Sequence, residues 1–287
     1  MPWYQLQDPN DPELDRLAEQ YHLHPLHIED CRSGNERTKT DRATNYLFTV
    51  LKAIHMPRGS DPNFPQVSIF VGSDFCITVG GPECESAGVF DRARRSGEDN
   101  HPSKLFYLIV DSVVDSYFSA VVIFDDQIDE LQDRVLDAPS PDVLQEIFNH
   151  KRCLVQLRRV LVNTRDACIV IQREGEGLIE PELAPFFRDV YDHISRSIDL
   201  AETERDLLTG TLDVYLSTVA NRTNEVVKVL TVLSTIALPA LVISSIYGMN
   251  VKGLPLIDSS YGGVLIFAAM ACTTLLLLWI LRRFRWL

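Results

Sequence analysis

The residues Tyr247-Gly248-Met249-Asn250 stand where a long uncharged run of the sequence ends, and their side chains suit a path for cations. Asn250 has a neutral carbonyl oxygen that can accept hydrogen bonds from the water shell of an ion without trapping it as carboxylates would. Mg²⁺ gives up its waters reluctantly and prefers oxygen ligands. Gly248 would let the backbone turn and expose carbonyls, with Tyr247 and Met249 packed behind. Taken alone, the segment could also be a helix C-cap with an interfacial tyrosine.

Histidines and cysteines could offer a second kind of metal chemistry, which their spacing does not favour. His22, His24 and His27 could form a zinc site, but positions two and three apart do not converge on one helix face, and Pro25 interrupts them. The six cysteines form neither a CxxC pair nor a zinc-ribbon pattern. We therefore expect the reduced thiols of a cytosolic domain.

Composition and motifs argue against two classes of function. The formal net charge of −13 argues against a nucleic-acid partner and fits a surface that collects cations. The sequence contains no GxSxG, P-loop or HExxH motif and no paired Cys/His nucleophile arrangement. We therefore do not expect an enzyme.

The sequence has two uncharged runs, at 229–251 and 259–281, and the first of them ends just after Tyr247-Gly248-Met249-Asn250. Each exceeds the ~20 apolar residues that cross the roughly 30 Å hydrocarbon core as a helix, so we predict two spans in a lipid bilayer. Arg282, Arg283 and Arg285 follow the second run and predict that both termini lie in the cytoplasm. The N-terminal residues show no secretory signal, so we expect the large charged domain to stay in the cytoplasm. The expected location of the protein is the cell (inner) membrane.

The charged remainder of the chain predicts an α+β cytosolic domain, a small β-sheet with flanking helices. Residues 45–54 and 66–79 are rich in β-branched and aromatic residues, with a turn at 72–74 between two short strands. Apolar residues recur at helical spacing over 103–136 and again over 142–173. Prolines separate these two stretches, which predicts an antiparallel helical pair.

A long helix, followed by two transmembrane helices, is expected beyond this domain. Residues 186–246 read as one helix about 90 Å long at ~1.5 Å per residue, too long to stand alone in water, so its apolar residues must pack on the pair or on copies of the chain. Two spans cannot enclose a water-filled path, so transport requires several subunits around an axis. The expected organisation is a cytosolic domain at 1–180 with the helical pair at 103–175, a stalk helix at 181–225, a first transmembrane helix at 226–246, an outer loop at 247–260, a second transmembrane helix at 261–281 and a basic tail at 282–287.

Four stretches together resemble the CorA family of divalent metal ion transporters, whose hallmark is Gly-Met-Asn after the first of two spans. They are LDVYLSTVANRTNEVVKVLTVLSTIALPALVISSIYGMN at 212–250, FFRDVYDH at 186–193, DSYFSAVVIFDDQIDELQDRVL at 115–136 and RRFRWL at 282–287. The resemblance covers most of the chain. It implies a funnel-shaped homopentamer whose stalk helix continues into a pore-lining first span, while the second span faces lipid.

One stripe of the stalk and first span, at alternating steps of three and four residues, is expected to face the pore. The candidates for the pore and gate are Asp213, Asn224, Val227, Leu230, Ser234, Leu238, Leu241 and Ser245. By resemblance, Asp213 and Asn224 match polar positions near the cytosolic side of the pore. The apolar members would form constrictions that gate by dewetting. Val227 and Leu238 stand where methionines are usual in the family, and Leu241 stands where a hydroxyl side chain is usual, which leaves a mid-pore hydration site open.

The resemblance also implies regulatory metal ligands. In the family, acidic residues at subunit interfaces bind intracellular Mg²⁺, which bridges neighbours and holds the closed state. The matching acids in this chain are Glu29, Asp30, Asp111 and Asp189. Two carboxylates from different subunits repel each other when the site is empty and attract through the ion when it is filled. They could also be ordinary solvated acids near helix ends. Arg282, Arg283 and Arg285 would, by the same resemblance, ring the stalk near the cytosolic gate.

The outer loop leaves the choice of cation open. After Asn250 it begins Val251-Lys252-Gly253, where members nearest the type examples carry an acid, and Asp258 is its only carboxylate. Loops of this kind resemble the zinc-transporting ZntB branch. The first hypothesis is potential-driven influx of Mg²⁺, with Co²⁺ or Ni²⁺ also admitted. The second is a Zn²⁺ transporter of the ZntB type, and the third is a membrane-tethered metal sensor that does not conduct.

Overall fold

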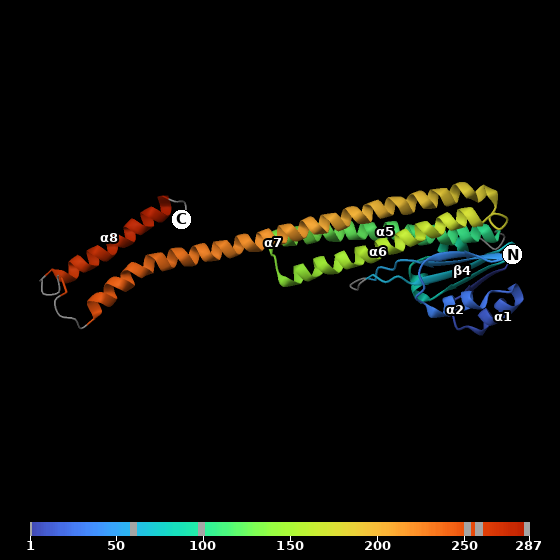
Figure 1. The fold of residues 1–287 in the computed structure, drawn as a ribbon, viewed down its shortest axis with the longest axis horizontal. Helices are drawn as coiled ribbons and strands as arrows, with labels where there is room; N and C mark the ends of the chain where they lie inside the picture. The colour runs from blue at the N-terminus through green and yellow to red at the C-terminus, as the bar shows by residue number, and fades with distance from the viewer. Residues whose placement is uncertain (1, 58–61, 97–100, 250–253, 256–260, 284–287) are drawn as a thin grey trace. The chain divides into compact units, whose positions relative to one another are not determined.

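The computed structural model of the chain describes residues 2–57, 62–96, 101–249, 254–255 and 261–283. It divides into two compact units, Met1–Asp213 and Val214–Leu287. The first unit contains a sheet with helices on both of its faces (Figure 1). The first part of the predicted stalk at 181–225 therefore belongs to this unit.

A five-stranded sheet forms the centre of the first unit. Its strands are β1 (Trp3–Leu6), β2 (Lys39–Arg42), β3 (Tyr46–Lys52), β4 (Gln66–Gly72) and β5 (Cys76–Gly80). The order across the sheet is β1-β5-β4-β3-β2, with β1 parallel to β5 and the other neighbours antiparallel. The strands predicted within 45–54 and 66–79 are confirmed, with the turn between β4 and β5. The two edge strands are not evident in the sequence, because each has four residues and β2 reads Lys-Thr-Asp-Arg.

Helices cover both faces of this sheet (Figure 1). On one face lie α1 (Pro12–Tyr21) and α2 (Pro25–Ser33), whose buried Leu14, Leu17 and Ile28 share a core with Phe48 and Phe70 of the sheet. The other face is covered by α5 (Pro102–Asp137) and α6 (Pro141–Glu174), which contact β2 to β5 between them. The short helices α3 (Pro82–Ser86) and α4 (Asp91–Arg95) lie between β5 and α5 in the chain.

The predicted helical pair is confirmed in α5 and α6. The break between them contains Pro139 and the cap Ser140, whose Oγ accepts a hydrogen bond from the backbone N–H of Val143 at 3.4 Å. Tyr117 of α5 is fully buried, and its hydroxyl donates to the Lys52 carbonyl at 2.7 Å. This bond ties α5 to strand β3.

A single helix, α7 (Ala184–Gly248), follows a short 3-10 turn at Pro181–Leu183 and runs for 65 residues. It confirms the continuous helix expected over 186–246. After it comes α8 (Gly262–Arg283). Arg282 and Arg283, the first residues of the predicted basic tail, are helical, because nothing in their sequence breaks the helix. The rest of that tail lies outside the described residues.

Three helices in the described part of the chain are long and apolar enough to cross a membrane. They are α5, the helix that ends at Gly248, and α8. In α5, 56% of the apolar window is buried inside the chain, whereas none of that window is buried in the other two. Two candidate spans therefore remain in the C-terminal region.

Candidate functional site

The Tyr247–Met249 segment closes the C-terminal end of α7. The Tyr247 hydroxyl donates a hydrogen bond to the Pro255 carbonyl at 3.2 Å, which ties the helix end to the chain that follows. Asn250, the residue expected to act as the filter, lies outside the described residues. Gly248 is the last residue of α7, and its φ is not positive, so the helix does not end there in a left-handed glycine conformation. The backbone N–H of Met249 instead bonds to the Ile246 carbonyl at 3.4 Å and tightens the final turn.

The described residues do not require the absence of a side chain at Gly248. A Cβ added there would meet no described heavy atom within 4 Å. Any steric need for glycine at this position must therefore come from atoms other than those of the described residues.

The predicted pore stripe is exposed along its whole length in the single chain. Its exposed members are Asp213, Asn224, Val227, Leu230, Ser234, Leu238, Leu241 and Ser245. Leu230 and Leu241 are 64% and 63% exposed, values that a soluble core helix does not show for leucine. All eight lie on one continuous helix, so their spacing places them on one side of it. The structure brings these residues into line but supplies no partner surface within the described chain.

Pro239 lies inside α7 without ending it. Proline has no N–H, so it leaves the carbonyl of Thr235, four residues earlier, without its helical donor. The sequence suggests that Ser244 or Ser245 could satisfy that carbonyl, and for Ser244 this is wrong. Its hydroxyl donates to the Leu241 carbonyl at 3.1 Å, because a helical serine reaches back three or four residues and no further.

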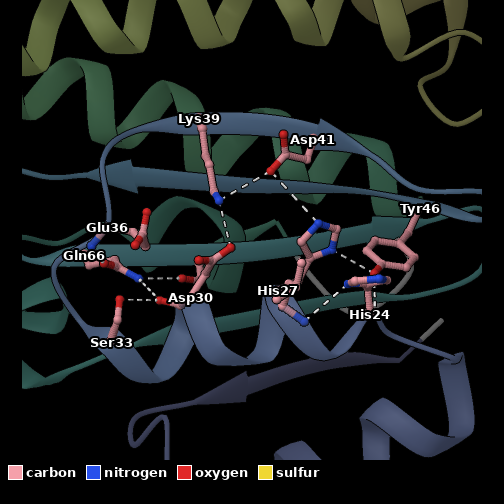
Figure 2. A network of polar contacts seen from close by, with 11 residues as sticks. His24, His27, Asp30, Ser33, Glu36, Lys39, Asp41, Tyr46 and Gln66 are labelled. Carbon is pink, nitrogen blue, oxygen red and sulfur yellow. Dashed lines mark hydrogen bonds and ion pairs between the residues drawn. The ribbon is translucent and has the colours of Figure 1, made fainter.

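Asp30, one of the four predicted regulatory acids, is already paired within the chain (Figure 2). Its Oδ2 accepts a hydrogen bond from Lys39 Nζ at 2.8 Å, and Lys39 also lies 3.5 Å from Asp41. Burial alone would lower the pKa of Lys39, but the hydrogen bond and charge of Asp30, with the charges of Asp41 and Glu36, outweigh it and raise the pKa. Lys39 therefore stays charged, and a metal ion at Asp30 would have to compete with this ammonium group.

The three histidines do not form a zinc site. His22 ends α1 in a left-handed conformation, His24 caps α2, and His27 stacks on Phe48 with a centroid distance of 4.4 Å. His27 Nδ1 lies 2.9 Å from the Tyr46 hydroxyl (Figure 2). Burial lowers the pKa of His27, so its ring is neutral in a structural network. Across the described residues, no group of three or more His, Cys, Asp or Glu side chains could hold a metal ion.

The cysteines are free thiols, as expected, and all but Cys272 are buried. Burial raises the pKa of Cys31 and Cys76 to about 12, so these thiols are protonated at neutral pH. Protonated, buried thiols are poor metal ligands, which agrees with a purely structural role.

Asp111 lies on the other side of the sheet and has its own cation. Arg92 of α4 makes ion pairs with both Asp111 and Asp115 of α5. Burial, followed by repulsion from Asp115, raises the pKa of Asp111, although Arg92 opposes the shift. Asp111 is thus held in a local α4–α5 contact, and it does not approach the Asp30 network within the interactions described.

Asp189 and Glu29 remain open to other molecules. Asp189 is 64% exposed near the start of α7 and has one ion-pair partner, His193, at 3.7 Å one helical turn away. Glu29 is exposed beside Asp30 on α2. The cationic partners Lys39 and Arg92 were not predicted, and their only signal is a basic residue within twenty positions of each acid. Arg282 and Arg283 are exposed at the end of α8, while Arg285 lies outside the described residues.

Comparisons with known proteins agree over the whole chain. A model of the family described as CorA-like Mg²⁺ transporter protein matches residues 1–283. The chain is 34% identical to the cobalt/magnesium transport protein CorA of Thermotoga maritima over 282 residues, 96% of this chain and 80% of that protein. The complete structure of the CorA magnesium transporter from Methanocaldococcus jannaschii matches with a TM-score of 0.86 at 24% identity, over 99% of this chain and 91% of that one. The ZntB cytoplasmic domain from Vibrio parahaemolyticus matches with a TM-score of 0.61 at 13% identity, over 77% of this chain and 88% of that one. At these identities the two structures show the fold alone.

Proposed function

This chain belongs to the family of CorA-like Mg²⁺ transporter proteins, and we propose that it conducts Mg²⁺ into the cell, with Co²⁺ or Ni²⁺ also admitted. It is a transporter and not an enzyme. The observation that carries the proposal is the C-terminal part of α7, which has an uncharged window with none of its residues buried inside the chain. This segment ends at Gly248 and Met249, next to a carboxamide.

An oligomer supplies the surfaces that the single chain lacks. Two transmembrane helices cannot enclose a water-filled path, and the hydrocarbon core of a bilayer offers no hydrogen-bond partners to polar groups that the protein leaves unpaired. Copies of α7 around an axis would line the path, and α8 would face lipid. The resemblance to the family points to a homopentamer. The exposed residues of the pore stripe support this arrangement, because Ser234 and Ser245 place hydroxyl groups among the leucines on one helix face.

Each part of the pore stripe would have its own task. A ring of Asn250 amides would accept hydrogen bonds from the waters of Mg²⁺ and let the hydrated ion enter and leave. The leucine rings, with Leu230 nearest the cytosolic side, would close the path by dewetting. Asn224 and Asp213 would attract the ion where it leaves the pore. The driving force is the membrane potential, worth about 2.3 kcal/mol per charge per 100 mV.

Regulation would come from the acids of the first unit. Asp189 would hold Mg²⁺ together with Asp30 or Glu29 of the next subunit, because its exposed carboxylate can reach a neighbour. A bound Mg²⁺ supplies two positive charges that hold the carboxylates of adjacent subunits together. The exposed carboxylate of Asp189 suits a bound Mg²⁺, whereas Asp30 would have to break its ion pair with Lys39 or bind the metal ion beside it. Asp111 fits least, because Arg92 already neutralises it.

A second candidate is Zn²⁺ transport of the ZntB type. It is favoured by the outer loop, which begins Val251-Lys252-Gly253 and resembles that of the ZntB branch, with a lysine where an acid would help attract a cation. The likeness to the ZntB cytoplasmic domain concerns the fold and does not decide between the ions. A metal sensor that does not conduct is the remaining alternative.

Flux into liposomes separates these functions. Purified protein is reconstituted, the vesicles are loaded with a Mg²⁺ dye or with a Zn²⁺ dye, and an inside-negative potential is imposed. We expect the Mg²⁺ signal to rise with potential and the Zn²⁺ signal to stay near that of protein-free vesicles. A Zn²⁺ signal alone would favour the second candidate. No flux of either ion would overturn the transport proposal in favour of a sensor.

A further inference from the structure

A buried carboxylate lies at a position where α7 packs within the first unit. The buried residues of this part of the helix recur mostly at steps of three and four, and they are Ile194, Ser197, Ile198, Ala201, Glu204, Leu208 and Thr211. Glu204 is the only acidic member of this stripe, and it is 5% exposed. Its Oε2 has no hydrogen-bond partner within the described chain. A glutamate at such a position is costly unless its charge is compensated.

The groups that act on Glu204 across the helix contact are negative. Asp125 and Asp129 of α5 both contribute, and Asp125 lies within hydrogen-bonding reach of Glu204. Asp125 and Asp129 are exposed, so they keep contact with water while Glu204 does not. Two ionised carboxylates cannot hydrogen-bond to each other, because both only accept. Such a pair needs a proton between its oxygens.

Other charged groups at this level of the helices have their own partners. On α6, Arg158 pairs with Glu202 at 2.6 Å, and Lys151 donates to the Thr209 hydroxyl at 3.2 Å. On α7 itself, Arg205 pairs with Asp206 at 2.9 Å. His150 of α6 lies 3.1 Å from Gln127 of α5. None of these cations is among the groups that shift the pKa of Glu204, which is raised first by burial and then by Asp125 and Asp129.

We propose that Glu204 and Asp125 form a proton-binding site between α7 and α5, in which protonated Glu204 donates a hydrogen bond to the Asp125 carboxylate. The buried group keeps the proton because its charged form would lose solvation, and the exposed group stays ionised. Loss of the proton would place like charges on the two helices in a contact that excludes water. The site therefore makes the stability of the packing between α7 and α5 depend on pH, and α7 continues into the candidate membrane segment.

The direction of the pH dependence follows from linkage. The ordinary pKa of the side chain is 4.5, and the folded chain raises it. The folded state therefore binds the proton more tightly than the unfolded state does. The stabilising contribution is complete below about pH 4.5 and is lost as pH rises through the folded-state pKa. Alkaline conditions should thus loosen α7 from α5.

The test uses the full chain in detergent or in lipid nanodiscs, with Glu204→Gln as a mimic of the protonated side chain. The apparent melting temperature and the hydrogen exchange of amides 200–208 are measured between about pH 5 and about pH 8. We expect the variant to melt about 3 °C above wild type at the alkaline end, with slower exchange, and the difference to vanish toward the acidic end. Asp125→Asn, at an exposed position that tolerates substitution, should shift the profile in the same direction by less.

A matched control changes the same side chain on the same helix. Glu202→Gln removes a half-exposed carboxylate two residues away that already pairs with Arg158, so its pH profile should run parallel to that of wild type. If Glu204→Gln and Asp125→Asn both keep the pH slope of wild type, the proton site is refuted. It is also refuted if Mg²⁺ at constant pH stabilises wild type but not Glu204→Gln, because the pair would then bind a metal ion.

Discussion

The two parts of α7 differ in what surrounds them, although they belong to one unbroken helix. In the first part, Phe187, Val190 and Ile194 are at most 1% exposed, because they face the core of the first unit. In the second part, Val226, Leu230 and Leu233 are each more than 60% exposed. Both parts are regular helix, so helix propensity does not account for the difference.

Apolar content alone therefore does not identify a membrane span. Helix α5 is apolar enough to cross a bilayer, yet much of its window is buried against the sheet and α6. The window near the end of α7 is more apolar still and is not buried inside the chain. An exposed stripe of leucines over several turns requires lipid or other copies of the chain. The first part of α7 is thus explained by the single chain, and the second only by what assembles around it.

The largest effect on stability should come from the buried part. Ile194→Ala removes three methyl or methylene groups from a fully buried position, so we expect the free energy of unfolding of the first unit to fall by about 2–5 kcal/mol. The measurement is thermal or urea unfolding of the full chain in detergent. Leu230→Ala is the matched control in the exposed part and should change this quantity by less than about 0.5 kcal/mol. Equal losses from both variants would erase the distinction between the two parts.

A smaller effect on folding, but a clear one on regulation, is expected at Asp189. Its side chain is exposed although it lies in the buried part of the helix, so Asp189→Ala should leave the unfolding transition within about 0.5 kcal/mol of wild type. The channel should then stay open at Mg²⁺ concentrations inside the vesicle that close wild type. Inhibition by internal Mg²⁺ is measured in dye-loaded liposomes. Unchanged inhibition would remove Asp189 from the regulatory site, and Asp192→Ala, on the same turn, serves as the control.

The most local effect is expected at the end of the exposed part. Tyr247→Phe deletes the hydroxyl that bonds to the Pro255 carbonyl and keeps the ring. We expect this change to lower the local free energy of unfolding at the helix end by about 0.5–1.5 kcal/mol. We expect faster hydrogen exchange at residues 246–249 and a lower rate of Mg²⁺ influx, with the oligomer intact. Exchange equal to that of wild type would show that this bond does not hold the helix end.

The long elements could be predicted because their signals are local. Proline breaks and apolar periodicity place α5, α6 and α7, and β-branched runs place the central strands. The edge strands could not be predicted, because pairing with a neighbouring strand, and not their own composition, makes them strands. The same holds for the candidate site. The sequence does not predict that Lys39 pairs with Asp30 or that Arg92 pairs with Asp111, since these ion pairs depend on how β2 and α4 pack.

Glu204 illustrates a signal that the sequence does contain. It is an acidic residue within the three-and-four repeat of buried residues on α7. An acid in such a repeat indicates either that the repeat has been assigned to the wrong residues or that the acid has a function. Only the structure reveals that Asp125 and Asp129 act on Glu204, and that the groups of the described chain that shift its pKa include no cation. The pore stripe is the converse case, because its spacing is plain in the sequence and its partner surface is absent from any single chain.

The most direct test of the account compares Mg²⁺ influx through wild type and Asn250→Ala at equal amounts of assembled oligomer. Both are reconstituted into dye-loaded liposomes, and the initial rate is recorded as an inside-negative potential is imposed. The account predicts that wild-type influx rises with the potential, while the variant falls to the rate of protein-free vesicles because the ring of carboxamides is lost. Influx through the variant at the wild-type rate would contradict the claim that cations enter past the end of α7.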